Sequence, residues 1–149
     1  MSAPALLDVN VLVALFDPEH VHHETAHDWF ESDRADGWAT CPLTENGFVR
    51  VLSNPARGGD VFRPTDLIAR LRRFCEAKEH QFWPDALTLR DAAVFNSSFI
   101  GGHQYLTDIY LLALATARGG RLATFDRRIP VKAVVGAKAA NLAVIAPAD

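Results

Sequence analysis

A histidine-rich stretch near the N-terminus contains the pattern His23-Glu24-x-x-His27. In zinc peptidases, two histidines with this helical spacing bind the metal and the glutamate acts as general base. On a helix, the polar residues of this stretch share one face, and Trp29 and Phe30 lie on the opposite, apolar side. We therefore expect the motif to lie on a solvated helix face without a catalytic role. A zinc peptidase remains one alternative.

A second candidate site consists of four acidic residues at the ends of predicted elements. Asp8 and Asp126 follow two apolar runs that predict strands. Glu45 and Asp108 fall in the first turns of two predicted helices. Carboxylates are common at helix N-termini, where they interact with the helix dipole, so this second pair has an ordinary explanation as well. Asp8 is the most unusual, because a carboxylate within an apolar stretch is costly to bury without partners.

These positions would bring the four carboxylates to one rim of a parallel sheet. In an open α/β sheet, the carboxyl ends of the strands and the N-termini of the crossover helices meet at one edge, where ligands bind. Carboxylates gathered there repel one another, and a divalent cation relieves that repulsion. Oxygen ligands without cysteine suit Mg²⁺ or Mn²⁺, and such ions activate water for attack on phosphate esters. The pattern predicts metal-dependent hydrolysis of phosphodiester bonds.

Short apolar runs must supply the strands that position these acids. The runs do not alternate between apolar and polar residues, which is typical of strands covered on both faces. We expect strands at Ala5–Asp8, Trp38–Cys41, Gln81–Trp83, Leu122–Phe125 and Leu142–Ala146. Because helical patterns separate the runs, the chain is predicted to be α/β, with a parallel sheet and helices on both faces.

The helical patterns lie between these runs, and two of them begin near a candidate acid. Thr44 and Thr107 are the expected N-caps in front of Glu45 and Asp108. Helices are expected at residues 20–32, from near Thr44 to Asn54, at 65–78, from the capping-box pattern Thr88-x-x-Asp91, and at 108–118. No repeat or linker interrupts the pattern, so residues 1–149 are expected to form one domain.

Composition and charge narrow the class of protein further. The net charge of −3 over 149 residues gives no overall basic footprint, which counts against a dedicated nucleic-acid binder but not against an enzyme with a local contact. Cys41 and Cys75 lie in apolar stretches and are expected to be buried thiols without a disulfide framework. The apolar N-terminus lacks a basic region and no run approaches a membrane span, so we expect a cytoplasmic protein without membrane contact.

Four stretches of the sequence together resemble a known family. LLDVNVLVALFD, PLTENGFVRVL, LTDIYLLALA and TFDRR are similar, in order and spacing, to motifs of the PIN-domain ribonucleases, specifically the VapC toxins of type II toxin–antitoxin pairs. The resemblance covers essentially the whole chain. It implies a three-layer Rossmann-like fold with a five-stranded parallel sheet of order 3-2-1-4-5. It also implies Mg²⁺- or Mn²⁺-dependent cleavage of an RNA (tRNA, rRNA or mRNA), inhibition by a small antitoxin protein, and a homodimer.

The resemblance also assigns roles to individual residues. The family's acidic quartet, which serves as catalytic and metal-binding residues, matches Asp8, Glu45, Asp108 and Asp126. Asn10 and Thr124 match polar positions beside the first and last acids, and we interpret them as hydrogen-bonding groups that hold the acids or a metal-bound water. Arg127 and Arg128 adjoin the site and either contact RNA phosphate or are solvated. The loop around Phe99-Ile100 and the exposed face of the 65–78 helix are expected edges of the antitoxin contact.

Two further alternatives compete with a ribonuclease. A receiver-type signalling domain needs an aspartate after the third strand and a lysine after the fifth. Trp83-Pro84-Asp85 satisfies the first requirement, but the ending VIAPAD contains no lysine. A PIN fold that binds RNA without cutting it is the other alternative, and the intact acidic quartet argues against it.

Overall fold

A five-stranded parallel sheet forms the centre of the computed structural model, which describes residues 3–59 and 61–147. Its strands are β1 (Ala5–Leu7), β2 (Trp38–Thr40), β3 (His80–Phe82), β4 (Arg121–Thr124) and β5 (Leu142–Val144). They are arranged in the order β3-β2-β1-β4-β5, and every pairing is parallel. The predicted sheet order and fold class are confirmed, and each strand lies within two residues of its predicted bounds.

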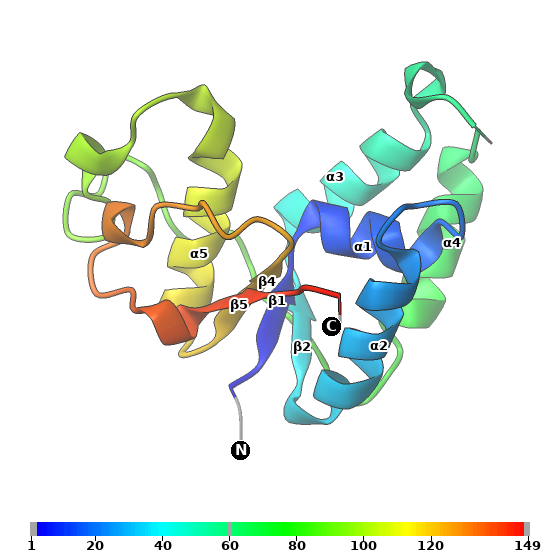
Figure 1. The fold of residues 1–149 in the computed structure, drawn as a ribbon, viewed down its shortest axis with the longest axis horizontal. Helices are drawn as coiled ribbons and strands as arrows, with labels where there is room; N and C mark the ends of the chain where they lie inside the picture. Colours follow the sequence, from blue (N-terminus) through cyan, green and yellow to red (C-terminus); the bar gives the residue numbers. More distant parts are fainter. Residues whose placement is uncertain (1–2, 60, 148–149) are drawn as a thin grey trace.

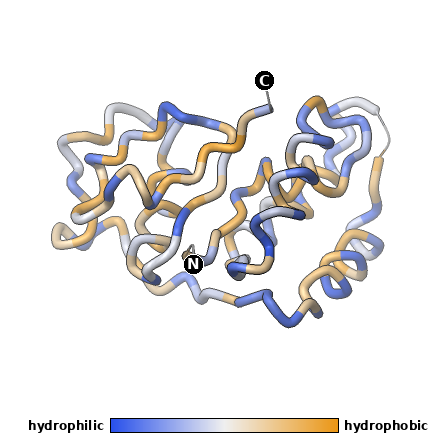
Figure 2. Tube along the Cα trace, turned by 60° about the horizontal axis from the view of Figure 1, so that its bottom comes forward, coloured by the Kyte–Doolittle hydropathy of each residue, from blue (hydrophilic) through white to orange (hydrophobic). Residues whose placement is uncertain are grey.

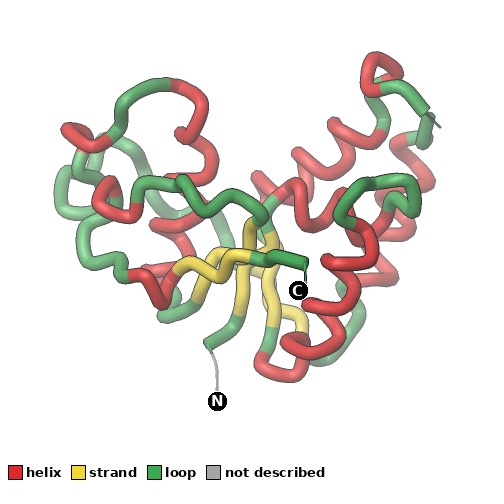
Figure 3. Tube along the Cα trace, in the orientation of Figure 1, coloured by secondary structure: helices red, strands yellow, loops and turns green. Residues whose placement is uncertain are grey.

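Helices cover both faces of the sheet (Figure 1). The helices are α1 (Val9–Phe16), α2 (His23–Asp33), α3 (Pro42–Leu52), α4 (Pro64–Phe74) and α5 (Leu106–Ala117). Helices α1 to α4 gather on one side, whereas α5 and the loops that follow it lie on the other. Figure 3 shows the same layers, with the strands between two groups of helices. None of the described helices is both long and apolar enough to cross a membrane.

Successive residues of each central strand face opposite hydrophobic cores. Leu7 packs in the core beneath α1 to α4, whereas Leu6 packs in the core beneath α5. Ala123 and Leu122 of β4 divide between the two cores in the same way. Because both faces are buried, the strands need no polar face, which explains the continuous apolar runs in the sequence. The helix after the grey segment in Figure 2, α4, instead alternates hydrophobic with hydrophilic residues, as an amphipathic helix does.

The sequence analysis did not predict α1. The residues of this helix from Val11 to Leu15 are all buried, so apolar side chains occur on every side and no amphipathic period marks the helix. Asp8, assigned to the end of the first strand, instead leaves the strand and serves as the N-cap of α1.

The N-caps predicted at Thr44 and Thr107 and the helix predicted from Thr88 were wrong, and α2 begins three residues later than predicted. Instead of a helix, the Thr88-x-x-Asp91 pattern forms a turn, in which Thr88 Oγ1 accepts from Arg90 N at 3.3 Å and Asp91 Oδ1 accepts from Ala93 N at 2.9 Å. Such local bonds compete with helix formation. Helix α3 begins earlier, after Cys41, and its third residue, Thr44, bonds back to the Cys41 amide at 3.0 Å. Helix α5 likewise begins before Thr107, with Tyr105 as N-cap.

Candidate active site

Asp8 is the most buried acid of the candidate site. Its backbone amide donates to Ala123 O at 3.1 Å, which fixes it between β1 and β4. Its Oδ1 accepts from Val11 N at 2.9 Å and so caps the first turn of α1. Only 3% of the residue is exposed, and this burial raises the pKa of Asp8 to about 6, although hydrogen bonds from the Thr124 hydroxyl and the Val11 amide oppose the shift. The charge of Asp108 raises the same pKa further.

Asp108 and Asp126 approach Asp8 from two other elements. Asp108 lies in the first turn of α5, as predicted, and burial followed by the charge of Asp126 raises the pKa of its carboxyl. Asp126 follows β4, and its amide donates to Thr124 Oγ1 at 3.2 Å. Hydrogen bonds from Arg128 hold the pKa of Asp126 below its usual value. Thr124 thus contacts the carboxyl of Asp8 and the backbone amide of Asp126.

These residues line one cavity of about 460 Å³. Its lining is polar and charged apart from Phe125, and consists of Asp8, Asn10, Asp108, Thr124, Phe125, Asp126, Arg127 and Arg128. The structure therefore brings together seven of the eight site residues named from the sequence. Three carboxylates at the carboxyl edge of a parallel sheet offer the hard oxygen donors that Mg²⁺ and Mn²⁺ prefer. Burial is the main cause that raises the pKa of Asp8 and Asp108, and repulsion from a neighbouring carboxylate raises both further. A divalent cation would relieve that repulsion.

Glu45 does not line this cavity. It lies in the first turn of α3, as predicted, but its Oε2 accepts a hydrogen bond from Thr40 Oγ1 at 2.7 Å. The same hydroxyl lies 2.8 Å from His80 Nε2. Glu45 therefore turns toward β2 and β3 at one edge of the sheet, whereas the three aspartates lie around β1 and β4.

Glu45 belongs to a second group of side chains, which the sequence analysis did not anticipate. Ligand atoms of Glu45, Cys75 and His80 all lie within 4.8 Å of one another. Burial lowers the pKa of His80, and burial together with the charge of Glu45 raises the pKa of the Cys75 thiol to about 11. Both cysteines are free thiols, but the expectation that both are buried is confirmed only for Cys41 and was wrong for the half-buried Cys75. The sequence offered one sign of this group, since Cys75 and His80 flank the short connection between α4 and β3.

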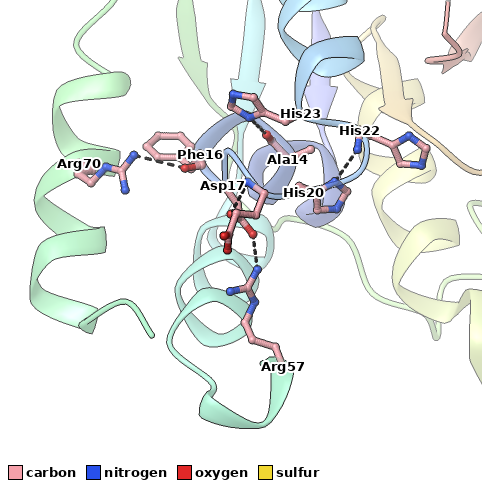
Figure 4. A network of polar contacts seen from close by, with 9 residues as sticks. Ala14, Phe16, Asp17, His20, His22, His23, Arg57 and Arg70 are labelled. Atoms are coloured by element: carbon pink, nitrogen blue, oxygen red, sulfur yellow. Dashed lines mark hydrogen bonds and ion pairs between the residues drawn. The ribbon is translucent and has the colours of Figure 1, made fainter. Parts of the chain in front are cut away.

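Both histidines of the H-E-x-x-H motif contact the end of α1, and Figure 4 shows the contact of His23 with Ala14. His23 Nδ1 lies 2.7 Å from Ala14 O, and His27 Nε2 lies 2.9 Å from Leu15 O. Arg70 adds a longer contact of 3.5 Å with Phe16 O. The last carbonyls of a helix lack partners within the helix, and these side chains supply them. The expectation of a solvated face holds for His27 and Glu24, which are exposed, but was wrong for His23, which is half-buried against α1.

The same geometry opposes a zinc peptidase site at this motif. A catalytic zinc needs a third protein ligand. Within the described ranges, the group of potential ligands that comes together is the one at Glu45, and it includes neither histidine of the motif.

Comparison with known proteins agrees with this fold. The sequence profile of the family described as "PIN domain" matches residues 5–135. Ribonuclease VapC44 of Mycobacterium tuberculosis is 43% identical over 143 residues, which cover 95% of this chain and 99% of that protein. Ribonuclease VapC39 of the same organism is 42% identical over 89% of this chain and 95% of its own length.

Two solved structures share the fold at low sequence identity. The crystal structure of Mycobacterium tuberculosis VapC20, described as a sarcin-ricin loop cleaving toxin, superposes with a TM-score of 0.58 at 13% identity. It covers 90% of this chain and 98% of its own. FitAB bound to the IR36 DNA fragment superposes with a TM-score of 0.59 at 19% identity, over 95% of this chain and 93% of its own. The chain therefore belongs to the PIN domain family, and its relatives within that family include VapC ribonucleases.

Proposed function

We propose that the chain is a Mg²⁺- or Mn²⁺-dependent endoribonuclease and the toxin of a type II toxin–antitoxin pair. The observation that carries the proposal is the convergence of Asp8, Asp108 and Asp126 on one cavity of about 460 Å³ at the carboxyl edge of the sheet. Relatives of the chain over nearly its whole length are named ribonucleases. The RNA is a tRNA, rRNA or mRNA, and the reaction is hydrolysis of a phosphodiester bond.

The three aspartates would hold the metal ion in this proposal. An ion bound there supplies an activated water and neutralises charge that develops on the phosphate. Asp8 is held in place by the Val11 amide and by Thr124, so its carboxylate is fixed before the ion arrives. Asn10, exposed at the mouth of the cavity, is placed to hydrogen-bond a water or a phosphate oxygen.

Basic residues beside the acids fit contact with the RNA backbone. Arg127 is exposed and lines the cavity, which suits a phosphate contact. Glu45 is the fourth acid of the proposed quartet, and it must leave Thr40 before it can join an ion in the cavity.

A small antitoxin protein would control this activity, because unrestrained RNA cleavage in the cytoplasm is harmful to the cell. An anionic cavity readily accepts an arginine or lysine of such an inhibitor, which could pair with Asp8 or Asp108. Phe99, 46% exposed, and Ile68 on α4, also 46% exposed, offer apolar contacts at the edges of this interface. A homodimer belongs to the same proposal and rests on the family alone.

Cleavage of RNA by aspartate variants tests the nuclease proposal. Asp8→Asn and Asp108→Asn should each abolish Mg²⁺-dependent cleavage while the far-ultraviolet circular dichroism spectrum stays unchanged. Asp28→Asn, which removes an exposed acid on α2, is the matched control and should cleave normally. Cleavage retained by either cavity variant would refute the proposal.

Growth of cells that express the chain tests the toxin proposal separately. Expression alone should arrest growth, and expression of Asp8→Asn should not. Co-expression with the small protein encoded by the adjacent reading frame should restore growth and yield a complex on gel filtration. If the wild-type chain is harmless alone and forms no such complex, the toxin proposal fails even if the nuclease proposal stands.

A further inference from the structure

Three potential metal ligands from different elements meet outside the aspartate cavity. Glu45 lies in the first turn of α3, Cys75 follows the last residue of α4, and His80 is the first residue of β3. Their ligand atoms all lie within 4.8 Å of one another, and all three residues are half-buried. Cys75 and His80 flank one short connection, and the packing of α3 against the sheet edge brings the more distant Glu45 to them.

The chemistry of this group differs from that of the aspartate cavity. Thiolate and imidazole ligands favour zinc-like cations, whereas Mg²⁺ and Mn²⁺ prefer sites made of oxygen alone. One Cys, one His and one carboxylate supply three of the four ligands of a tetrahedral zinc-type site. A hollow of about 220 Å³ adjoins Glu45 and Cys75, and it offers room for an external fourth ligand.

Neighbouring side chains hold two of the three ligands in place. The buried Thr40 hydroxyl donates to Glu45 Oε2 at 2.7 Å and lies 2.8 Å from His80 Nε2. The His80 ring packs against Trp38, with 4.7 Å between ring centroids. Hydrogen bonds and packing of this kind orient metal ligands before the metal binds.

We propose that Glu45, Cys75 and His80 bind a zinc-type divalent cation at a site separate from the aspartate cavity. This proposal rests on the proximity of these three residues and does not depend on the chain being a ribonuclease. Because Glu45 is also the fourth acid of the proposed nuclease site, an ion bound here holds Glu45 at the β2–β3 edge. Thr40 is a positioning residue, since it acts through Glu45 and His80.

Cobalt titration of the reduced, chelator-treated full chain tests the proposal directly. Co²⁺ should bind at one equivalent per chain and produce the near-ultraviolet charge-transfer band of a thiolate–cobalt bond. Added Zn²⁺ should displace the Co²⁺ and remove the band. Cys75→Ser should abolish the band. His80→Gln should reduce the affinity for Co²⁺, and Thr40→Val should weaken it about 10- to 100-fold, as is usual for residues that orient ligands.

Two controls separate this site from other parts of the molecule. Cys41→Ala, which removes the other thiol, and the double variant Asp8→Asn/Asp108→Asn should both keep the band, with circular dichroism to confirm folding. A stoichiometric band that requires Cys75 and survives both controls supports the site, whatever the outcome of the RNA-cleavage experiments. The proposal is overturned if no thiolate band forms at one equivalent, or if the band survives Cys75→Ser.

Discussion

Arg128 binds Asp126 through both its backbone and its side chain. The backbone amide of Arg128 donates to Asp126 Oδ1 at 2.8 Å, and the side-chain Nε of Arg128 donates to the same oxygen at 3.2 Å. The guanidinium therefore occupies a carboxylate that the proposed metal ion also needs. Because 77% of the Arg128 side chain is exposed, this pair is weak and can open at little cost.

Removal of the Arg128 side chain should therefore strengthen metal binding. An exposed ion pair is weak, so Arg128→Ala should raise the affinity for Mg²⁺ by no more than a few-fold. Isothermal titration calorimetry without RNA measures this effect. Arg127→Ala removes a neighbouring positive charge without this contact, and an equal gain in that variant would show that the Asp126 contact is not the cause.

Replacement of Asp8 should stabilise the metal-free protein at neutral pH. The folded-state pKa of about 6 lies above the ordinary value of 3.8, so between these pH values the folded state binds more protons than the unfolded state. The free energy of unfolding therefore falls as the pH rises from 3.8 to 6. Above pH 6 this penalty for ionising the buried Asp8 is present in full. A shift of about two pKa units corresponds to about 3 kcal/mol.

Asp8→Asn keeps an N-cap residue and removes this penalty. Chemical denaturation with a chelator present should show the variant more stable than wild type by up to about 3 kcal/mol at pH 8. At pH 4 the difference should nearly vanish, because little of Asp8 is then ionised in the folded state. Added Mg²⁺ should stabilise the wild type alone. A variant less stable than wild type at pH 8 would show that the ionised Asp8 carboxylate does not destabilise the folded protein.

Alanine at both motif histidines should destabilise the fold without loss of nuclease activity. His23 and His27 each satisfy one carbonyl at the end of α1, and one hydrogen bond contributes about 0.5–1.5 kcal/mol. The double variant should therefore lose about 1–3 kcal/mol of unfolding free energy. His103→Ala, at an exposed position, is the control and should change neither property. Cleavage abolished in a folded double variant would restore a catalytic role to the motif.

Gly47 allows α3 to approach α1 directly behind Asp8. A Cβ at Gly47 would lie 2.6 Å from Val9 Cγ2, so Gly47→Ala should cost about 1–3 kcal/mol through overpacking. Val9→Ala removes the opposing methyl groups, and the double variant should recover part of that loss. Denaturation of the four proteins in a double-mutant cycle measures the coupling. Additive effects would show that this contact does not limit the helix packing.

The sequence alone determined the parts of the fold that depend on local pattern. Continuous apolar runs marked the central strands, because each of them buries both faces and needs no polar residue. The edge strand β3 has a polar, more exposed sequence. Acids placed after strands and in first turns pointed to one edge, because all strand ends of a parallel sheet lie together. Three of the four acids do share a cavity there.

Tertiary contacts decided what the pattern left open. Helix α1 lacks an amphipathic period because it is covered on nearly all sides. The motif histidines contact α1 because the end of that helix presents unpaired carbonyls to them. Glu45 lies apart from the aspartates because Thr40, on the adjacent strand, offers its carboxylate a hydrogen bond. Each of these outcomes depends on how different elements pack together, which the pattern of residues within one element does not specify.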